Sequence, residues 1–156
     1  MPGIDKLAEA CPVSLAISLH ATNNYLRDKL VPLNKKYPIE KLLETCKNYS
    51  RATNDSQITF EYVMLKDVND TIKEASVLIK LLEGIPAKVN LIPFNPYKNS
   101  LFERSEERAI NNFRDKLYKA GIITITRKTR GSDIDAACGQ LVGQVEQRRK
   151  NIQNTH

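Results

Sequence analysis

The stretch Ile58-Thr-Phe-Glu-Tyr-Val-Met-Leu65 decides the fold class, because the β-branched and aromatic residues that dominate it are typical of a strand. Residues 71–83 follow it with apolar side chains at helical spacing, and Gly84 stands where a helix usually ends. Residues 88–93 then form another strand-like run. A strand, a helix and a strand in this order predict a right-handed βαβ unit with two parallel strands.

The same alternation extends in both directions along the chain. We expect further strands over residues 13–20 and 122–127, and helices over residues 2–10, 38–49 and 105–120, with a last helix ending at residue 150. This order predicts a largely parallel α/β sheet. Four strands are too few to close a barrel, which usually needs about eight. The chain is therefore either a small open α/β domain or the C-terminal piece of a larger barrel.

Local patterns add detail to these elements. The first strand is apolar almost throughout, which is typical of a strand buried on both faces, and Asn23 and Asn24 predict a turn after it. Cys46 falls on the apolar stripe of helix 38–49, so we interpret it as a core residue. In the next helix we expect the buried residues to be Ile72, Ala75, Ile79 and Leu82, and the capping residues before it to be Asp67, Asn69 and Asp70.

Composition bounds the class of protein. The 156 residues suit one domain over residues 1–150 with a frayed tail over 151–156, and the net charge of +6 weakly favours a polyanionic partner. The apolar runs are too short for a membrane span and no leader is evident, so we expect a cytoplasmic protein. Three widely spaced cysteines favour a reducing compartment and argue against a metal site made by this chain alone.

Polar residues collect where the predicted strands end, which is the edge at which parallel sheets bind ligands. They are Ser18, His20, Asn95, Arg127, Lys128 and Arg130, followed by Cys138 among small neighbours. Each also has a structural interpretation. Ser18 and His20 would be polar residues at a strand end, and Asn95 would be a turn residue. The three cations would form an exposed charged loop, and Cys138 would be a buried thiol. In the functional interpretation Cys138 is a reachable thiol near a helix start, where the dipole and Arg130 favour the nucleophilic thiolate. No hydrolase triad, phosphate-binding loop or dinucleotide fingerprint is present.

Five segments together resemble one family, and they run through most of the chain. They are Ser18-Leu-His-Ala21, Leu26-Arg-Asp-Lys-Leu-Val-Pro-Leu-Asn-Lys-Lys-Tyr-Pro38, Phe60-Glu-Tyr-Val-Met-Leu65 with Val68-Asn69-Asp70, Val89-Asn-Leu-Ile-Pro-Phe-Asn-Pro-Tyr97, and Arg127-Lys-Thr-Arg-Gly-Ser-Asp-Ile-Asp-Ala-Ala-Cys-Gly-Gln-Leu141. The chain resembles the radical S-adenosylmethionine methyltransferases that modify carbon 2 of adenine in 23S ribosomal RNA and certain tRNAs.

The resemblance implies a fold and a mechanism. The fold is the C-terminal half of a (β/α)6 partial barrel, and Cys138 is the cysteine that accepts a methyl group from S-adenosylmethionine. A second S-adenosylmethionine on a 4Fe-4S cluster yields a radical that activates this methyl group, and the resulting carbon radical adds to adenine. By the same resemblance Ser18, Leu19, His20 and Asn95 contact S-adenosylmethionine. Arg127, Lys128 and Arg130 are hypothetical RNA contacts.

The chain also departs from the family. The Cys-x3-Cys-x2-Cys cluster motif, the Gly-Glu motif for S-adenosylmethionine and the second catalytic cysteine are absent from its sequence. We therefore expect this chain to be inactive alone. We also expect it to be a monomer, and we expect the parent protein to need a reductant for its cluster. The alternative interpretation is a non-catalytic, basic RNA-binding α/β module in which Cys138 is structural.

Overall fold

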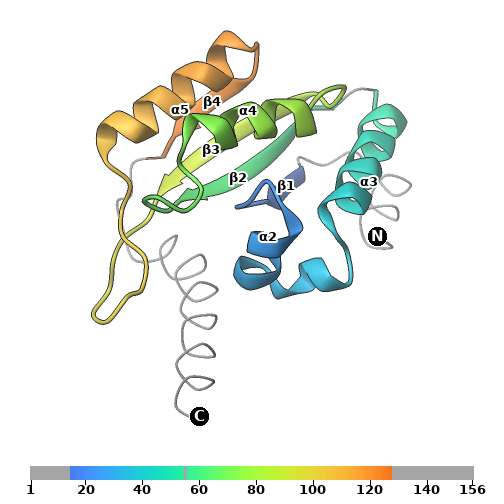
Figure 1. The fold of residues 1–156 in the computed structure, drawn as a ribbon. Coiled ribbons are helices and arrows are strands. Elements are labelled where there is room, and N and C mark those ends of the chain that lie inside the picture. The colour runs from blue at the N-terminus through green and yellow to red at the C-terminus, as the bar shows by residue number, and fades with distance from the viewer. Residues whose placement is uncertain (1–14, 55, 128–156) are drawn as a thin grey trace.

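The computed structural model describes residues 15–54 and 56–127, and these form a single sheet flanked by helices. Strands β1 (Leu15–Ser18), β2 (Ile58–Met64), β3 (Ala87–Pro93) and β4 (Ile123–Thr126) pair in chain order, and every pairing is parallel (Figure 1). The predicted parallel α/β sheet is confirmed. Parallel pairing brings the carboxyl ends of all four strands to one edge.

Three helices pack on one face of this sheet: α3 (Ile39–Ala52), α4 (Ile72–Leu81) and α5 (Glu107–Lys119) (Figure 1). Their apolar stripes meet alternate strand residues in one core that includes Phe60, Tyr62, Leu91, Phe113 and Cys46. Cys46 is fully buried, so its predicted core role is confirmed. The Tyr62 and Phe113 rings stack at 5.2 Å between centroids, joining β2 to α5.

The opposite face of the sheet carries the remaining strand residues, and most of it is polar. In register across it lie Ser18, Glu61 and Asn90, with Thr59 and Lys88 in the row before them. The prediction that the first strand is buried on both faces is wrong, because Ala16 is exposed and β1 already ends at Ser18. Toward the carboxyl edge this face becomes apolar, since Val63 and Ile92 pack with Leu30 in a second, smaller core.

A helix forms where the sequence predicted only a turn. Helix α2 (Asn24–Leu30) and the 3-10 turn η1 (Pro32–Lys35) connect β1 to α3. Asn23 is the N-cap of α2, since its side-chain oxygen accepts a 2.8 Å hydrogen bond from the backbone N–H of Leu26. A seven-residue helix is too short to show clear apolar periodicity, which explains why the pattern does not reveal it.

Two local predictions for α4 are wrong. Thr71, and not the preceding Asp67, Asn69 or Asp70, caps this helix by accepting a hydrogen bond from the backbone N–H of Glu74. Ile72 is 45% exposed, and Leu78 occupies the buried position instead. Ala75 and Leu82 are buried as predicted.

Some predictions fall outside the described residues: helix 2–10, the last helix, the tail 151–156, and Lys128, Arg130 and Cys138. Within the described part, no helix is both long and apolar enough to cross a membrane.

Candidate ligand site at the strand ends

The chain leaves β1 through a sharp turn at its carboxyl end. The backbone N–H groups of Leu19 and His20 both donate to the carbonyl of Glu61 on β2, at 3.0 and 3.3 Å. His20 then adopts a left-handed conformation with φ 60°, which costs a non-glycine residue about 1 kcal/mol. The Leu19 side chain is fully buried in the main core. The three predicted residues Ser18, Leu19 and His20 therefore form one constrained turn at the edge where parallel sheets usually bind ligands.

The imidazole of His20 is buried and asymmetric. Its Nδ1 accepts a 3.0 Å hydrogen bond from the backbone N–H of Val63, so the proton of the neutral ring lies on Nε2. Nε2 is buried without a partner among the described residues. Burial lowers the pKa of His20 to about 4, and the nearby Arg27 cation contributes to the same shift. At neutral pH His20 is therefore an uncharged ring with one unused donor.

Asn69, in the connection from β2 to α4, holds this turn from the other side. Its Nδ2 donates to the carbonyls of His20 and Val63 at 3.0 and 2.8 Å, and its Oδ1 accepts from the N–H of Leu65 at 2.8 Å. The hydroxyl of Tyr62 donates to the Asn69 carbonyl at 2.7 Å. Asn69 is fully buried, so these bonds form away from competing water.

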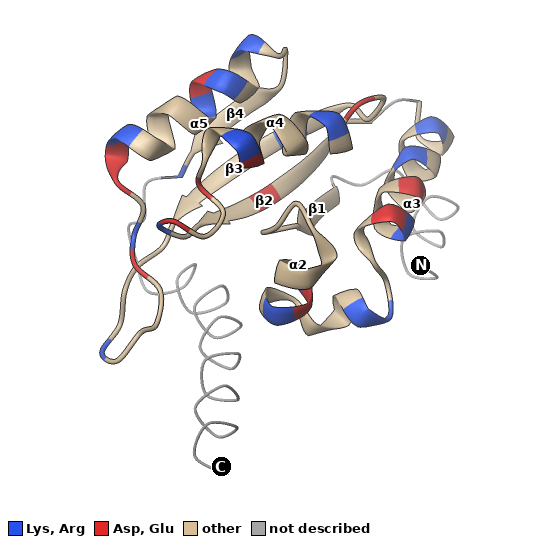
Figure 2. Cartoon of the chain, in the orientation of Figure 1, with Lys and Arg blue, Asp and Glu red and all other residues tan. Residues whose placement is uncertain are grey.

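Arg127 directly follows β4 on the same edge. Its backbone N–H extends the sheet by donating to the carbonyl of Leu91 at 2.8 Å, and its Nη1 lies 3.7 Å from Oε1 of Glu61. Glu61 is the acidic residue that Figure 2 shows within β2. Both side chains are partly exposed, so this ion pair is worth less than about 1 kcal/mol. Arg127 also lines a pocket of about 240 Å³ with Arg104 and Arg114.

Asn95 lies two residues beyond the end of β3 and is exposed. The structure thus places Ser18, His20, Asn95 and Arg127 at or just beyond strand ends. It shows that Ser18, Leu19 and His20 share one turn.

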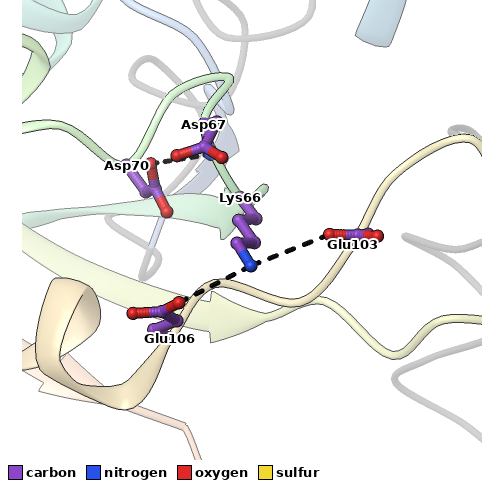
Figure 3. A network of polar contacts seen from close by, with 5 residues as sticks. All are labelled: Lys66, Asp67, Asp70, Glu103 and Glu106. Atoms are coloured by element: carbon purple, nitrogen blue, oxygen red, sulfur yellow. Dashed lines mark hydrogen bonds and ion pairs between the residues drawn. The ribbon is translucent and has the colours of Figure 1, made fainter.

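A second pocket, of about 360 Å³, opens between the starts of α4 and α5. Lys66 sits there among four carboxylates, 3.5 Å from Glu106 and 3.9 Å from Glu103 (Figure 3). Asp70 accepts a 3.1 Å hydrogen bond from the backbone N–H of Asp67. These carboxylates disfavour phosphates, so a polyanion is not expected to bind in this pocket.

The described residues suit a polar organic ligand better than a metal. Among residues 15–54 and 56–127, Nε2 of His20 and Oγ1 of Thr126, the last residue of β4, are buried near strand ends without a hydrogen-bond partner. S-adenosylmethionine, which carries several hydrogen-bond acceptors, fits such donors. Among residues 15–54 and 56–127, no three His, Cys, Asp or Glu side chains gather as a metal site would require. The described residues therefore do not fit an iron–sulfur cluster.

Comparison with known proteins agrees with this architecture. No family model matches the chain. It is 55% identical over 153 residues to the dual-specificity RNA methyltransferase RlmN of Vesicomyosocius okutanii, covering 97% of this chain. A radical SAM methyltransferase from Sphaerobacter thermophilus superposes with a TM-score of 0.81 at 47% identity over 89% of this chain. The chain is similar to the C-terminal part of RlmN-type radical SAM methyltransferases.

The chain spans about two fifths of the length of these relatives, 43% of the first and 41% of the second. A domain of a pyruvate-formate lyase-activating enzyme from Bacteroides vulgatus shares the fold, with a TM-score of 0.64 at 16% identity. The predicted partial-barrel fold of radical SAM type is confirmed.

Sequence reasoning missed three buried polar residues around the Ser18–His20 turn. Arg27 and Asn34 lie within a quoted family segment, but nothing in their spacing showed that both are buried. Asn69 was interpreted as a helix cap, whereas its side chain bonds backbone groups of three residues. No local pattern singles these residues out, because each is followed directly by a charged residue.

Proposed function

We propose that this chain forms the C-terminal part of an enzyme that methylates carbon 2 of adenine in 23S rRNA and tRNA. The 55% identity to a dual-specificity RNA methyltransferase, over almost the whole chain, carries the proposal. The geometry supports it, because the turn that holds Ser18 and His20 lies at the edge where parallel sheets bind ligands.

In this proposal Ser18, Leu19, His20 and Asn95 hold S-adenosylmethionine, which supplies the methyl group when bound. His20 offers its Nε2–H as a fixed donor. Leu19 acts through its place in the turn, because its side chain is buried and its N–H and carbonyl both have partners.

Cys138 is the proposed methyl carrier. Carbon 2 of adenine is a poor nucleophile, so direct methyl transfer to it is unfavourable. A methyl group on the Cys138 sulfur is tethered beside its target, which supplies the proximity that an intermolecular reaction lacks. Arg127, Lys128 and Arg130 would contact RNA phosphates, and Arg127 is the one of the three that the structure describes.

The 4Fe-4S cluster and its reductant belong to the rest of the proposed enzyme. The cysteines of this chain, Cys11, Cys46 and Cys138, do not have the spacing of the cluster motif. We therefore propose that the chain, a cytoplasmic monomer, does not methylate RNA alone. Reconstitution of the 156-residue chain with iron and sulfide tests this directly, and a stable cluster absorbance would contradict it.

A hybrid enzyme tests the function itself. The N-terminal part of the Vesicomyosocius okutanii relative is joined to this chain and produced in cells that lack their own adenine-C2 methyltransferase. Mass spectrometry of digested 23S rRNA and tRNA should show 2-methyladenosine. The Cys138→Ala hybrid should show none, while Cys46→Ala, the matched change at a buried cysteine, should retain it.

The outcomes separate two functions. Undiminished methylation by the Cys138→Ala hybrid would exclude Cys138 as the methyl carrier. A wild-type hybrid that binds RNA without methylating it would favour the non-catalytic RNA-binding module.

A further inference from the structure

The guanidinium of Arg27 lies beneath the end of β1 and donates to backbone carbonyls. Nη2 donates to Ser18 at 3.0 Å, and Nε donates to Leu19 at 3.1 Å. Nη1 donates to Oδ1 of Asn34 at 2.8 Å. Arg27 is only 6% exposed, and burying a cation is costly unless its donors are used. A side chain this costly to bury is expected to have a role beyond filling space.

The carbonyls that Arg27 binds belong to the turn that ends in the left-handed His20. Asn69 binds the next carbonyl, that of His20, at 3.0 Å. Three consecutive carbonyls, those of Ser18, Leu19 and His20, therefore each accept a hydrogen bond from a buried side chain. One helix and one loop, distant in sequence, hold the turn from two sides.

Asn34 braces the guanidinium in turn. Its Nδ2 donates to Oδ1 of Asp28 at 2.6 Å and to Oδ1 of Asn24 at 3.1 Å. The same Asn24 oxygen accepts the backbone N–H of Ile39 at 3.0 Å, at the start of α3. Asn34 is 1% exposed, so this bracing forms in a dry environment. The network fixes Arg27 relative to both α2 and α3.

We infer that Arg27, braced by Asn34, is a positioning residue that holds the Ser18–His20 turn in the conformation that binds S-adenosylmethionine. The inference rests on the proposed function of this turn as a ligand site. Arg27 acts on the ligand through the backbone of Ser18 and Leu19 and through the resulting place of the His20 ring.

The geometry requires arginine rather than a cation alone. The planar fork presents three nitrogens toward three acceptors in fixed directions, whereas lysine places one ammonium on a flexible stem. An Arg27→Lys variant keeps the charge and loses the fork. A decrease in ligand affinity in that variant would therefore report geometry and not charge.

The experiment uses the hybrid enzyme with Arg27→Lys, and with Asn34→Ala in case the first variant folds poorly. Equilibrium dialysis with labelled S-adenosylmethionine measures the dissociation constant, and circular dichroism checks the fold. We expect the dissociation constant to rise about tenfold for Arg27→Lys and about threefold for Asn34→Ala. KM for S-adenosylmethionine should rise with it, while kcat changes less than about twofold, as expected when only binding is affected.

Arg51→Lys is the matched control, because Arg51 is an exposed arginine of α3. It should leave both constants unchanged. Folded Arg27→Lys and Asn34→Ala hybrids that bind as tightly as wild type would overturn the inference. A wild-type hybrid that itself fails to bind S-adenosylmethionine would instead overturn the proposed ligand site, and the inference with it.

Discussion

The backbone N–H of Val63 on β2 donates a 3.0 Å hydrogen bond to Nδ1 of His20, forty-three residues earlier in the chain. The bond ties the end of one strand to its neighbour through a side chain and sets which ring nitrogen carries the proton. Because His20 also has a left-handed backbone, the ring and the turn are held together. This relationship is the structural centre of the proposed ligand site.

Acid should destabilise the chain through His20. Its pKa falls from 6.5 in the unfolded chain to about 4 in the folded protein, so between these values the unfolded state binds more protons. The stability that depends on neutral His20 is fully present above pH 6.5 and is lost as the pH falls toward 4. We expect the free energy of unfolding in urea to be about 2 kcal/mol lower at pH 5 than at pH 7 from this residue.

A His20→Gln variant supplies the comparison for this effect. Its amide does not titrate, while all other acidic and basic groups remain. The part of the pH dependence that is due to His20 should disappear in this variant. Equal pH dependence in the two proteins would contradict the assignment.

Replacing Asn69 by Ala should lower the free energy of unfolding by about 3 kcal/mol, because it leaves the buried N–H of Leu65 and the carbonyls of His20 and Val63 without their partner. Urea unfolding of the 156-residue chain measures the change. Asn112→Ala, at an exposed position of α5, is the control and should cost less than about 1 kcal/mol. Equal effects of the two substitutions would show that the Asn69 bonds contribute little.

Cys46 should resist alkylation in the folded chain. It is fully buried, and burial raises the pKa of its thiol to about 11, so very little reactive thiolate exists at neutral pH. Treatment with iodoacetamide at pH 7.5, followed by peptide mass spectrometry, should show labelling of Cys46 only after urea is added. Comparable labelling without urea would mean that the α3 core opens readily.

Arg127→Gln tests the proposed RNA contact. Loss of its 3.7 Å ion pair with Glu61 should lower stability by less than about 1 kcal/mol. If Arg127 neutralises a phosphate, the slope of log affinity for tRNA against log salt concentration should become shallower by about one. Arg108→Gln, at an exposed site of α5, should leave the slope unchanged. An unchanged slope for Arg127→Gln would show that Arg127 does not contact a phosphate and has only a structural role at the sheet edge.

Local sequence patterns predicted much of this fold correctly. The strand 58–65 and helix 38–49 appear close to their expected positions, since apolar periodicity reflects which side of each element is buried. The pattern failed for Ile72, which was expected to be buried and is exposed, because helical periodicity alone does not say where the sheet lies. It also failed for α2, whose seven residues are held by tertiary hydrogen bonds of Asn24 and Arg27.

The sequence by itself determined the alternation of strands and helices, the placement of Ser18, His20, Asn95 and Arg127 near strand ends, and the resemblance to adenine-C2 methyltransferases. These follow from local periodicity and from motif identity, which need no coordinates. Only the tertiary structure decided that Arg27, braced by Asn34, and Asn69 both bind the Ser18–His20 turn, and that His20 is a buried neutral donor. Hydrogen bonds between residues distant in the chain depend on how the elements pack, and no single segment carries that information.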